Sequence, residues 1–454
     1  MQIRYHERLC LSNTTKHVMQ DNRDGPVSYR GTVFGEMNTR GLTPLLAPLK
    51  VAAFRRAWFG SSIAVLADQA FLVSLTWLVL RITDSGAALG TVLAVAAIPG
   101  IVLTPLGGVL SDRLSPITVM SSANAARAAL MGTLTLLVLA DATRIWHLYL
   151  LAGGLSALDA LYYPASMSVT PILVNRDRLN AANALVQGVE QISSVLGPAL
   201  AGLLLAIFGL WIGLGSNAVL FFLAAVIFAT VARSSPSDAG VTEVAETEGA
   251  DHAGDTGAFA ALVQGARYAW NDPVIRTIML ILIGINLAMA GPIYVGGSIL
   301  AEARLGGAGA FATLVAVGGV GSLIGAMAAG SSARIRRRGL VELGCTAALG
   351  MGVGGLAFSP NLFVAGTLAA LIGMTATFLA VINISWLQER SEPGLTGRVM
   401  SLAMFSAVSL DPISYVLAGM LVEVSLTAVF LSAGGLLLFT ALLGATSRTM
   451  RTAS

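Results

Sequence analysis

The sequence predicts an all-α membrane protein in which twelve transmembrane helices form two pseudo-symmetric bundles of six. Of its 454 residues, 55% are hydrophobic and 11% are charged, about half the charged share of a soluble domain. Twelve apolar stretches run for about 19 to 28 residues each, enough for a helix to cross the hydrocarbon core of a bilayer. A polar gap divides the stretches into two sets of six.

The spans follow one another with short loops. The first six are residues 57–80, 87–110, 117–140, 147–171, 181–208 and 211–232. The second six are residues 274–300, 308–333, 340–358, 361–387, 396–421 and 424–445. Basic loops follow the second and the fourth span of both sets, which indicates an internal repeat. Two parallel repeats place a cavity between them near the bilayer midplane.

The segments outside the spans are polar. Residues 1–54 mix both signs of charge and are expected to form a disordered cytoplasmic extension. One hypothesis is that Met37 is the true start of the protein. The bundles are assigned to residues 55–232 and 274–446, and residues 447–454 to a cytoplasmic tail.

Residues 233–273 are expected to be a cytoplasmic linker. Its first part is acidic and is expected to be a solvated tether. Apolar residues at helical spacing from Phe259 to Trp270 predict an amphipathic helix on the inner membrane surface. A short helix without a regulatory role is the simpler interpretation.

The loop charges predict the orientation. Alternating spans put both ends of the chain on one side, whose flanks hold 17 lysines and arginines against 3 on the other side. Basic flanks stay in the cytoplasm. We therefore expect a multi-pass protein of the cell membrane with both termini cytoplasmic.

Composition excludes several function classes. The basic residues that give the net charge of +3 are spread along membrane edges, so no nucleic-acid surface is expected. Only two cysteines, Cys10 and Cys345, occur, and the four histidines are scattered, so we expect no disulfide framework and no metal site. No phosphate-binding loop or catalytic triad is readable, so we expect no enzyme and no cofactor.

Four acidic residues lie inside the predicted spans: Asp68, Asp159, Glu190 and Asp411. A charge in the bilayer costs about 2.5 to 3.5 kcal/mol on insertion scales, so such acids are candidates for proton coupling or cation contact. The alternative is that each is a hydrogen-bonded packing residue. Asp411 ranks last, because the helix kink at Pro412 explains its neighbourhood. Arg127 either pairs with one of the acids or extends to the membrane edge.

Polar residues accompany three of these acids on single helix faces. Gln69 follows Asp68, while Tyr162, Tyr163 and Ser166 share a face with Asp159. The face of Glu190 also carries Asn183, Gln187, Gln191 and Ser194. We expect these side chains to line a hydrated cavity, although Tyr162 and Tyr163 would equally serve in helix packing.

The loop after the second span carries a recognisable motif. Gly108, Leu110, Asp112 and Arg113 match the signature G-x-L-x-D-R-x-G-R-R, whereas Ser115, Pro116 and Ile117 depart from it. Because this loop follows the second of twelve spans, the chain resembles the major facilitator superfamily, and the resemblance covers residues 55–445. The resemblance implies that Gly108, Asp112 and Arg113 form a gating loop, without the full charge relay.

The fifth span adds a second match. Gly197, Pro198 and Gly202 resemble the antiporter motif of the superfamily, and together with Asn183 and Gly397-Arg398 they resemble the macrolide-efflux and siderophore-export branch. Ser193 and Ala201 replace glycines of that motif. Ordinary packing of small residues is the alternative.

These resemblances imply a proton antiporter that exports small amphipathic molecules such as drugs, secondary metabolites or siderophores by alternating access. The expected partners are the lipid bilayer, protons and a small-molecule substrate, with the proton gradient as energy source and a monomer as functional unit. A proton-coupled uptake symporter of the same fold is the first alternative. A non-transporting membrane receptor or enzyme is the second.

Overall fold

Every element in the described part of the chain is a helix, which confirms the predicted fold class. The computed structural model describes residues 46–113, 115–234, 267–268, 270–331, 337–391 and 396–446. Residues 1–45 of the amino-terminal extension, most of the linker with its amphipathic helix, and the tail lie outside these residues. The end of the predicted disordered extension is helical instead, because residues 47–50 form a short turn of helix and the first long helix begins at Ala52. Ten of the described helices are long and apolar enough to cross a membrane.

The first bundle contains six long helices. They are α2 (Ala52–Thr83), α3 (Gly86–Arg113), α4 (Pro116–Leu139), α5 (Ile145–Leu173), α6 (Leu179–Phe208) and α7 (Leu210–Ser234), with short turns η1 (Ala47–Lys50) and η2 (Arg176–Arg178). Helix α5 is 29 residues long, but it is not among the ten span candidates. It carries the polar residues Asp159, Tyr162, Tyr163 and Ser166, which make it less apolar.

The second bundle repeats this arrangement with two interruptions. Its elements are α9 (Pro273–Gly291), η3 (Pro292–Gly296), α10 (Gly297–Leu300), η4 (Ala301–Leu305), α11 (Ala308–Ser331), α12 (Arg338–Leu356), α13 (Leu362–Arg390), α14 (Thr396–Val408), α15 (Asp411–Val424) and α16 (Leu426–Thr446). The run from α9 to η4 is one span of 33 residues that widens to a π-helix at Pro292. Such π-turns relieve the clash that a proline ring makes inside an α-helix.

The eleventh predicted span is two shorter helices. Helix α14 ends at Val408 and α15 begins at Asp411. Pro412 lies in the first turn of α15, where its ring would meet the carbonyl of Val408 if the helix continued. The sequence predicted a kink at Pro412 within one helix, and the structure places the break just before it.

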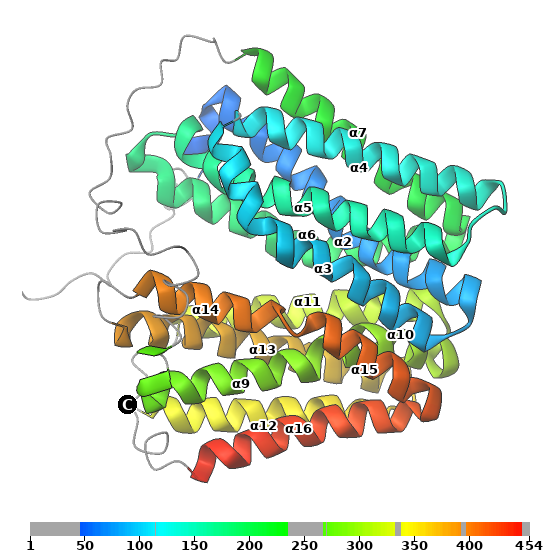
Figure 1. Ribbon diagram of the computed structural model, residues 1–454, viewed down its shortest axis with the longest axis vertical. Coiled ribbons are helices and arrows are strands. Elements are labelled where there is room, and N and C mark those ends of the chain that lie inside the picture. The colour runs from blue at the N-terminus through cyan, green and yellow to red at the C-terminus, as the bar shows by residue number, and fades with distance from the viewer. Residues whose placement is uncertain are drawn as a thin grey trace, which may run out of the picture. The chain divides into compact units, whose positions relative to one another are not determined.

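Helices within each bundle pack around shared neighbours. In the first bundle α4 packs on α7, α3 on α5, and α2 on α6 and α7. In the second, α11 packs on α13, α12 on α16, and α9 on α15 and α16. Helix α2 begins and α16 ends on the same side of the bundles (Figure 1). We call this side the terminal face and the opposite side the distal face.

The two bundles meet through α3 with α15 and α6 with α11 (Figure 1). The crossings are close because small residues allow backbones to approach. A Cβ atom on Gly90 of α3 would overlap the carbonyl oxygen of Tyr415 on α15, and one on Gly202 of α6 would overlap the Cβ of Ala312 on α11. Both crossings lie toward the distal face, so the bundles are closed against each other there.

A hydrogen-bonded contact completes this distal closure. Glu423, near the end of α15, accepts hydrogen bonds from the hydroxyl of Ser85 at 2.8 Å and from the backbone N–H of Ala87 at 3.1 Å. Both donors belong to the turn that opens α3. We call the contacts of Gly90 and Glu423 with the opposite bundle the distal seal.

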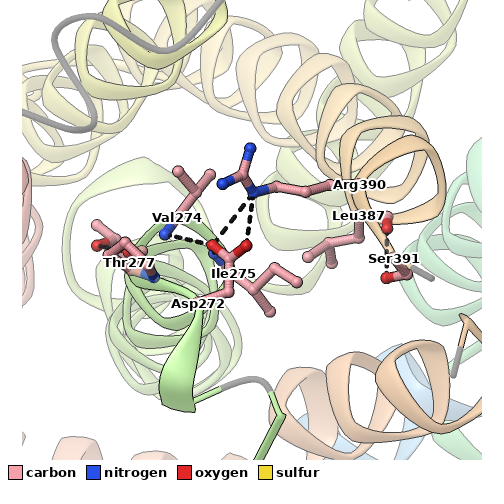
Figure 2. Close-up of polar contacts among 8 residues, drawn as sticks. Asp272, Val274, Ile275, Thr277, Leu387, Arg390 and Ser391 are labelled. Atoms are coloured by element: carbon pink, nitrogen blue, oxygen red, sulfur yellow. Dashed lines mark hydrogen bonds and ion pairs between the residues drawn. The ribbon is translucent and has the colours of Figure 1, made fainter.

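On the terminal face, Asp272 ties α9 to α13 (Figure 2). Its Oδ1 accepts from the backbone N–H groups of Val274 at 2.8 Å and Ile275 at 3.1 Å, so it caps the start of α9. Nε of Arg390, at the end of α13, lies 2.9 Å from Oδ2 of the same carboxylate. One side chain therefore fixes the ends of two helices.

Replacing Asp272 with alanine is expected to lower the free energy of unfolding by about 1 kcal/mol, the usual effect of losing a cap. Asp272→Asn keeps a capping oxygen and loses only the half-exposed ion pair, which contributes about 0 to 1 kcal/mol. Thermal unfolding of the purified protein in detergent measures both. Equal unfolding temperatures for Asp272→Ala and the unchanged chain would contradict the capping role.

Candidate functional site

Arg127 is the centre of a charged cluster inside the first bundle. Its side chain, on α4, is 1% exposed. The guanidinium forms an ion pair with Asp159 of α5, and its Nη1 lies 3.7 Å from Oδ2 of Asp68 on α2. The sequence left open whether Arg127 pairs with an acid, and the structure places it between two of them.

Aromatic rings complete the setting of the guanidinium. Its carbon lies 4.5 Å from the ring centre of Tyr162 and 5.5 Å from that of Phe221. Such contacts hold a cation in place without neutralising it. Nε and Nη1 of Arg127 have no hydrogen-bond partner among the described residues. The cluster therefore holds one fixed positive charge, two carboxylates and guanidinium N–H groups that are free to donate further hydrogen bonds.

The two carboxylates line a cavity of about 740 Å³ within the first bundle. The side chain of Asp68 is 36% exposed and that of Asp159 is 52% exposed. The other predicted residues that line this cavity are Gln69, Tyr162, Tyr163, Ser166, Asn183, Gln187 and Glu190. The expected polar cavity thus gathers side chains from α2, α4, α5 and α6. We call it the polar cavity.

A second cavity of about 390 Å³ lies between the two bundles and is mostly apolar. Gln191, Ser194 and Pro198 of α6 line it, so the predicted polar face of α6 divides between two cavities. Helices α2, α9, α11 and α13 supply most of the remaining walls. Gln69 lines both cavities, which therefore adjoin at this side chain. We call the second one the apolar cavity.

Asp411 lies apart from the other three acids. As the first residue of α15, it accepts a hydrogen bond from Nδ2 of Asn286 on α9 at 2.8 Å. Three residues on, the hydroxyl of Ser414 donates to the carbonyl of Leu287 at 2.7 Å and accepts from the N–H of Gly291 at 2.8 Å. These bonds hold the broken eleventh span against α9.

Two of the three residues of the antiporter-like motif, Gly197 and Gly202, lie at helix crossings. A Cβ on Gly197 would lie 2.5 Å from the Cβ of Gln69 on α2, so this glycine brings α6 against the helix that carries Asp68. Gly202 faces α11 of the second bundle, and Pro198 lines the apolar cavity. Gly108, Asp112 and Arg113 of the predicted gating loop lie in the last turns of α3, and their side chains are outside the described residues.

One buried acid escaped the sequence analysis. Glu342 is the third residue of the predicted span 340–358, but it was not among the four acids singled out from the sequence. In the structure it is 0% exposed. The signal was available, because an acid anywhere within an apolar span is expensive.

Comparison with known proteins places the chain among transporters. Residues 57–410 match the profile of the Major Facilitator Superfamily. The multidrug efflux pump Tap of Mycolicibacterium fortuitum is 26% identical over 80% of this chain and 87% of its own length. Macrolide efflux protein A of Streptococcus pyogenes is 22% identical over 77% of this chain and 86% of its own.

Solved structures share the fold at lower identity. The nucleoside transporter NupG superposes with a TM-score of 0.67 at 14% identity, covering 87% of this chain and 98% of its own. A bacterial homologue of the iron transporter ferroportin, in an inward-facing state, superposes with a TM-score of 0.64 at 18% identity, covering 87% of this chain and 99% of its own. These likenesses concern the fold alone.

Proposed function

From the premise that the chain belongs to the Major Facilitator Superfamily of membrane transporters, we propose that it exports small amphipathic molecules in exchange for protons. The observation that carries this proposal is the position of Arg127 between Asp68 and Asp159 in a cavity. One guanidinium neutralises one carboxylate, so the cluster has room for one further positive charge. A proton and a cationic group of a substrate would compete for it.

The proposed transport cycle starts from the predicted orientation of the chain. With the basic terminal face in the cytoplasm, the distal seal closes the outer half, and the structure is inward-facing. A substrate from the cytoplasm then displaces the proton, which leaves to the cytoplasm. After the bundles rock, a proton from outside displaces the substrate. The distant similarity to the two drug-efflux proteins supports export.

The two adjoining cavities suit a molecule with two chemically different ends. The apolar cavity accommodates a hydrocarbon or aromatic body, while the polar cavity offers carboxylates, amides and the exposed ring of Tyr163 to a cationic or hydrogen-bonding group. Glu190 lines the polar cavity at the α6 wall and adds a further negative charge. We therefore propose amphipathic cations as the substrate class.

Neutralising Asp68 or Glu190 is expected to abolish proton-driven export while leaving the fold intact. Asp68→Asn and Glu190→Gln keep the side-chain size and remove a charge from the polar cavity. Accumulation of a fluorescent cationic drug in everted vesicles, with a drug-susceptibility panel in a pump-deficient host, measures the effect. Vesicles that contain either variant should accumulate no more drug than vesicles without the protein.

The matched control is Glu302→Gln, which removes the same charge from an exposed residue on the distal face. It should transport like the unchanged chain. Undiminished transport in both cavity variants would refute the assignment of the acids. Accumulation in whole cells instead of everted vesicles would identify an uptake symporter.

A further inference from the structure

Glu342 forms an isolated polar pair with Asn383 in the core of the second bundle. Glu342 lies on α12 and is 0% exposed, while Asn383 lies on α13 and is 1% exposed. Nδ2 of Asn383 donates to Oε1 of Glu342 at 3.1 Å. The other oxygen of each group, Oε2 of Glu342 and Oδ1 of Asn383, is buried without a hydrogen-bond partner. Neither residue lines the polar cavity or the apolar cavity.

An ionised carboxylate does not fit this position. A buried charge requires an opposite charge or several hydrogen bonds, and one neutral amide donor provides neither. The unpartnered buried oxygen on each residue adds a further desolvation cost. Two unpartnered oxygens that lie in a bonded pair lack a donor, and a hydrogen on Oε2 would supply one.

The charged groups around the pair are engaged elsewhere. On α12, Arg338 binds Glu389 of α13 at 2.6 and 3.1 Å. On α13, Arg390 pairs with Asp272, and on α9 the guanidinium of Arg276 lies over the ring of Trp270. Helix α16 has no ionisable residue between Leu426 and Thr446. The remaining titratable group near Glu342 among the described residues is the thiol of Cys345, one turn later on α12.

We propose that Glu342 is a proton-binding site, held as a carboxylic acid in this state by a two-hydrogen-bond pairing with Asn383. The acid O–H donates to the amide oxygen, and the amide N–H donates to the acid carbonyl. Release of the proton leaves a carboxylate that needs water, so it requires α12 and α13 to part. The Arg338–Glu389 ion pair spans the same two helices at the terminal face.

This site is separate from the cluster around Arg127, since it belongs to the other bundle. Proton binding at Glu342 is independent of the direction of transport. If Glu342 carries a second proton in the transport cycle, that role rests on the proposed function. The experiment therefore reads protonation directly and not through export.

Infrared difference spectra of the purified full-length protein, recorded as the pH is raised, test the site. The C=O stretching band of a protonated carboxyl group is separate from the bands of carboxylates. Glu342→Gln should lose one such band that the unchanged chain shows near neutral pH. The exposed-acid control Glu302→Gln should keep it.

Two further measurements keep the test decisive. Glu342→Gln puts an amide in place of the acid and can still pair with Asn383, so this variant should unfold at the same temperature as the unchanged chain. Asn383→Ser retains the acid but changes its partner, and it should shift the frequency of the band without abolishing it. This second variant covers the case in which Glu342→Gln fails to fold.

Two outcomes would overturn the proposal. One is a protonated-carboxyl band that stays unchanged in Glu342→Gln and in Asn383→Ser. The other is stabilisation of the unchanged chain by Na⁺ that Glu342→Gln loses, which would identify the two unpartnered oxygens as ligands of a metal cation. Loss of the band together with undetectable antiport would retain the proton site and reject the proposed function.

Discussion

Arg127→Met is expected to abolish proton-driven export and to destabilise the first bundle. Methionine fills much of the space of the arginine stem, but it leaves Asp68 and Asp159 without their shared cation. Removing one partner of a buried ion pair costs about 3 to 5 kcal/mol. We expect the lower end of this range, because both carboxylates are exposed to the polar cavity and can be hydrated or protonated there.

Thermal unfolding in detergent and drug accumulation in everted vesicles measure the two effects. Arg127→Lys is the first control. It keeps the charge but not the planar guanidinium that reaches two carboxylates, so it should recover stability more than export. The double variant Asp68→Asn, Asp159→Asn in the Arg127→Met background should recover stability alone. Export by Arg127→Met with unchanged dependence on pH would show that the cluster has no part in coupling.

Gly90→Val is expected to prevent closure of the distal seal. The valine Cβ would overlap the carbonyl oxygen of Tyr415 across the interface between the bundles. Overpacking of this kind costs about 1 to 3 kcal/mol. Because Gly90 contacts the opposite bundle, the cost falls on the closed arrangement, and an energy of this size changes the ratio of closed to open molecules by about 5-fold to 150-fold.

Cross-linking measures this change. In a chain without its native cysteines, Ser85→Cys and Glu423→Cys place two thiols across the distal seal. Gly90→Val should lower the yield of the disulfide between them and should stop export. Gly132→Val is the matched control, since a Cβ on Gly132 has no neighbour within 4 Å. A full yield of cross-linked Gly90→Val would contradict the role of this crossing.

The sequence predicted the spans well because the bilayer imposes a length and a polarity on each of them. Local departures were harder to place. Pro412 indicated a kink, yet the break falls before Asp411, where the proline ring would meet the preceding turn. The π-turn at Pro292 did not interrupt the hydrophobic pattern, because Ile293 and Val295 keep this part of the span apolar.

The candidate site was predictable where the free-energy cost of placing a charged group in the membrane is enough to identify a residue. Asp68, Asp159 and Glu190 were recognised as acids in apolar spans, and the structure brings all three to the polar cavity. Their pairing with Arg127 depends on how α2, α4 and α5 are rotated about their axes, which periodicity does not give. For the same reason, the single polar face of α6 did not reveal that Gln191 and Ser194 line a different cavity from Glu190.

Glu423 determines how pH acts on the distal seal. The N–H of Ala87 and the hydroxyl of Ser85 stabilise its carboxylate and lower the pKa of Glu423 below the ordinary value for glutamate. Its contribution to closure is therefore complete above that ordinary value and is lost only as the pH falls through the lowered one. Mild acidity therefore leaves the hydrogen bonds of Glu423 intact, so this carboxylate does not act as a pH sensor for the distal seal. We therefore expect the distal seal to open in response to a change elsewhere, such as a change of the group bound at the cluster around Arg127.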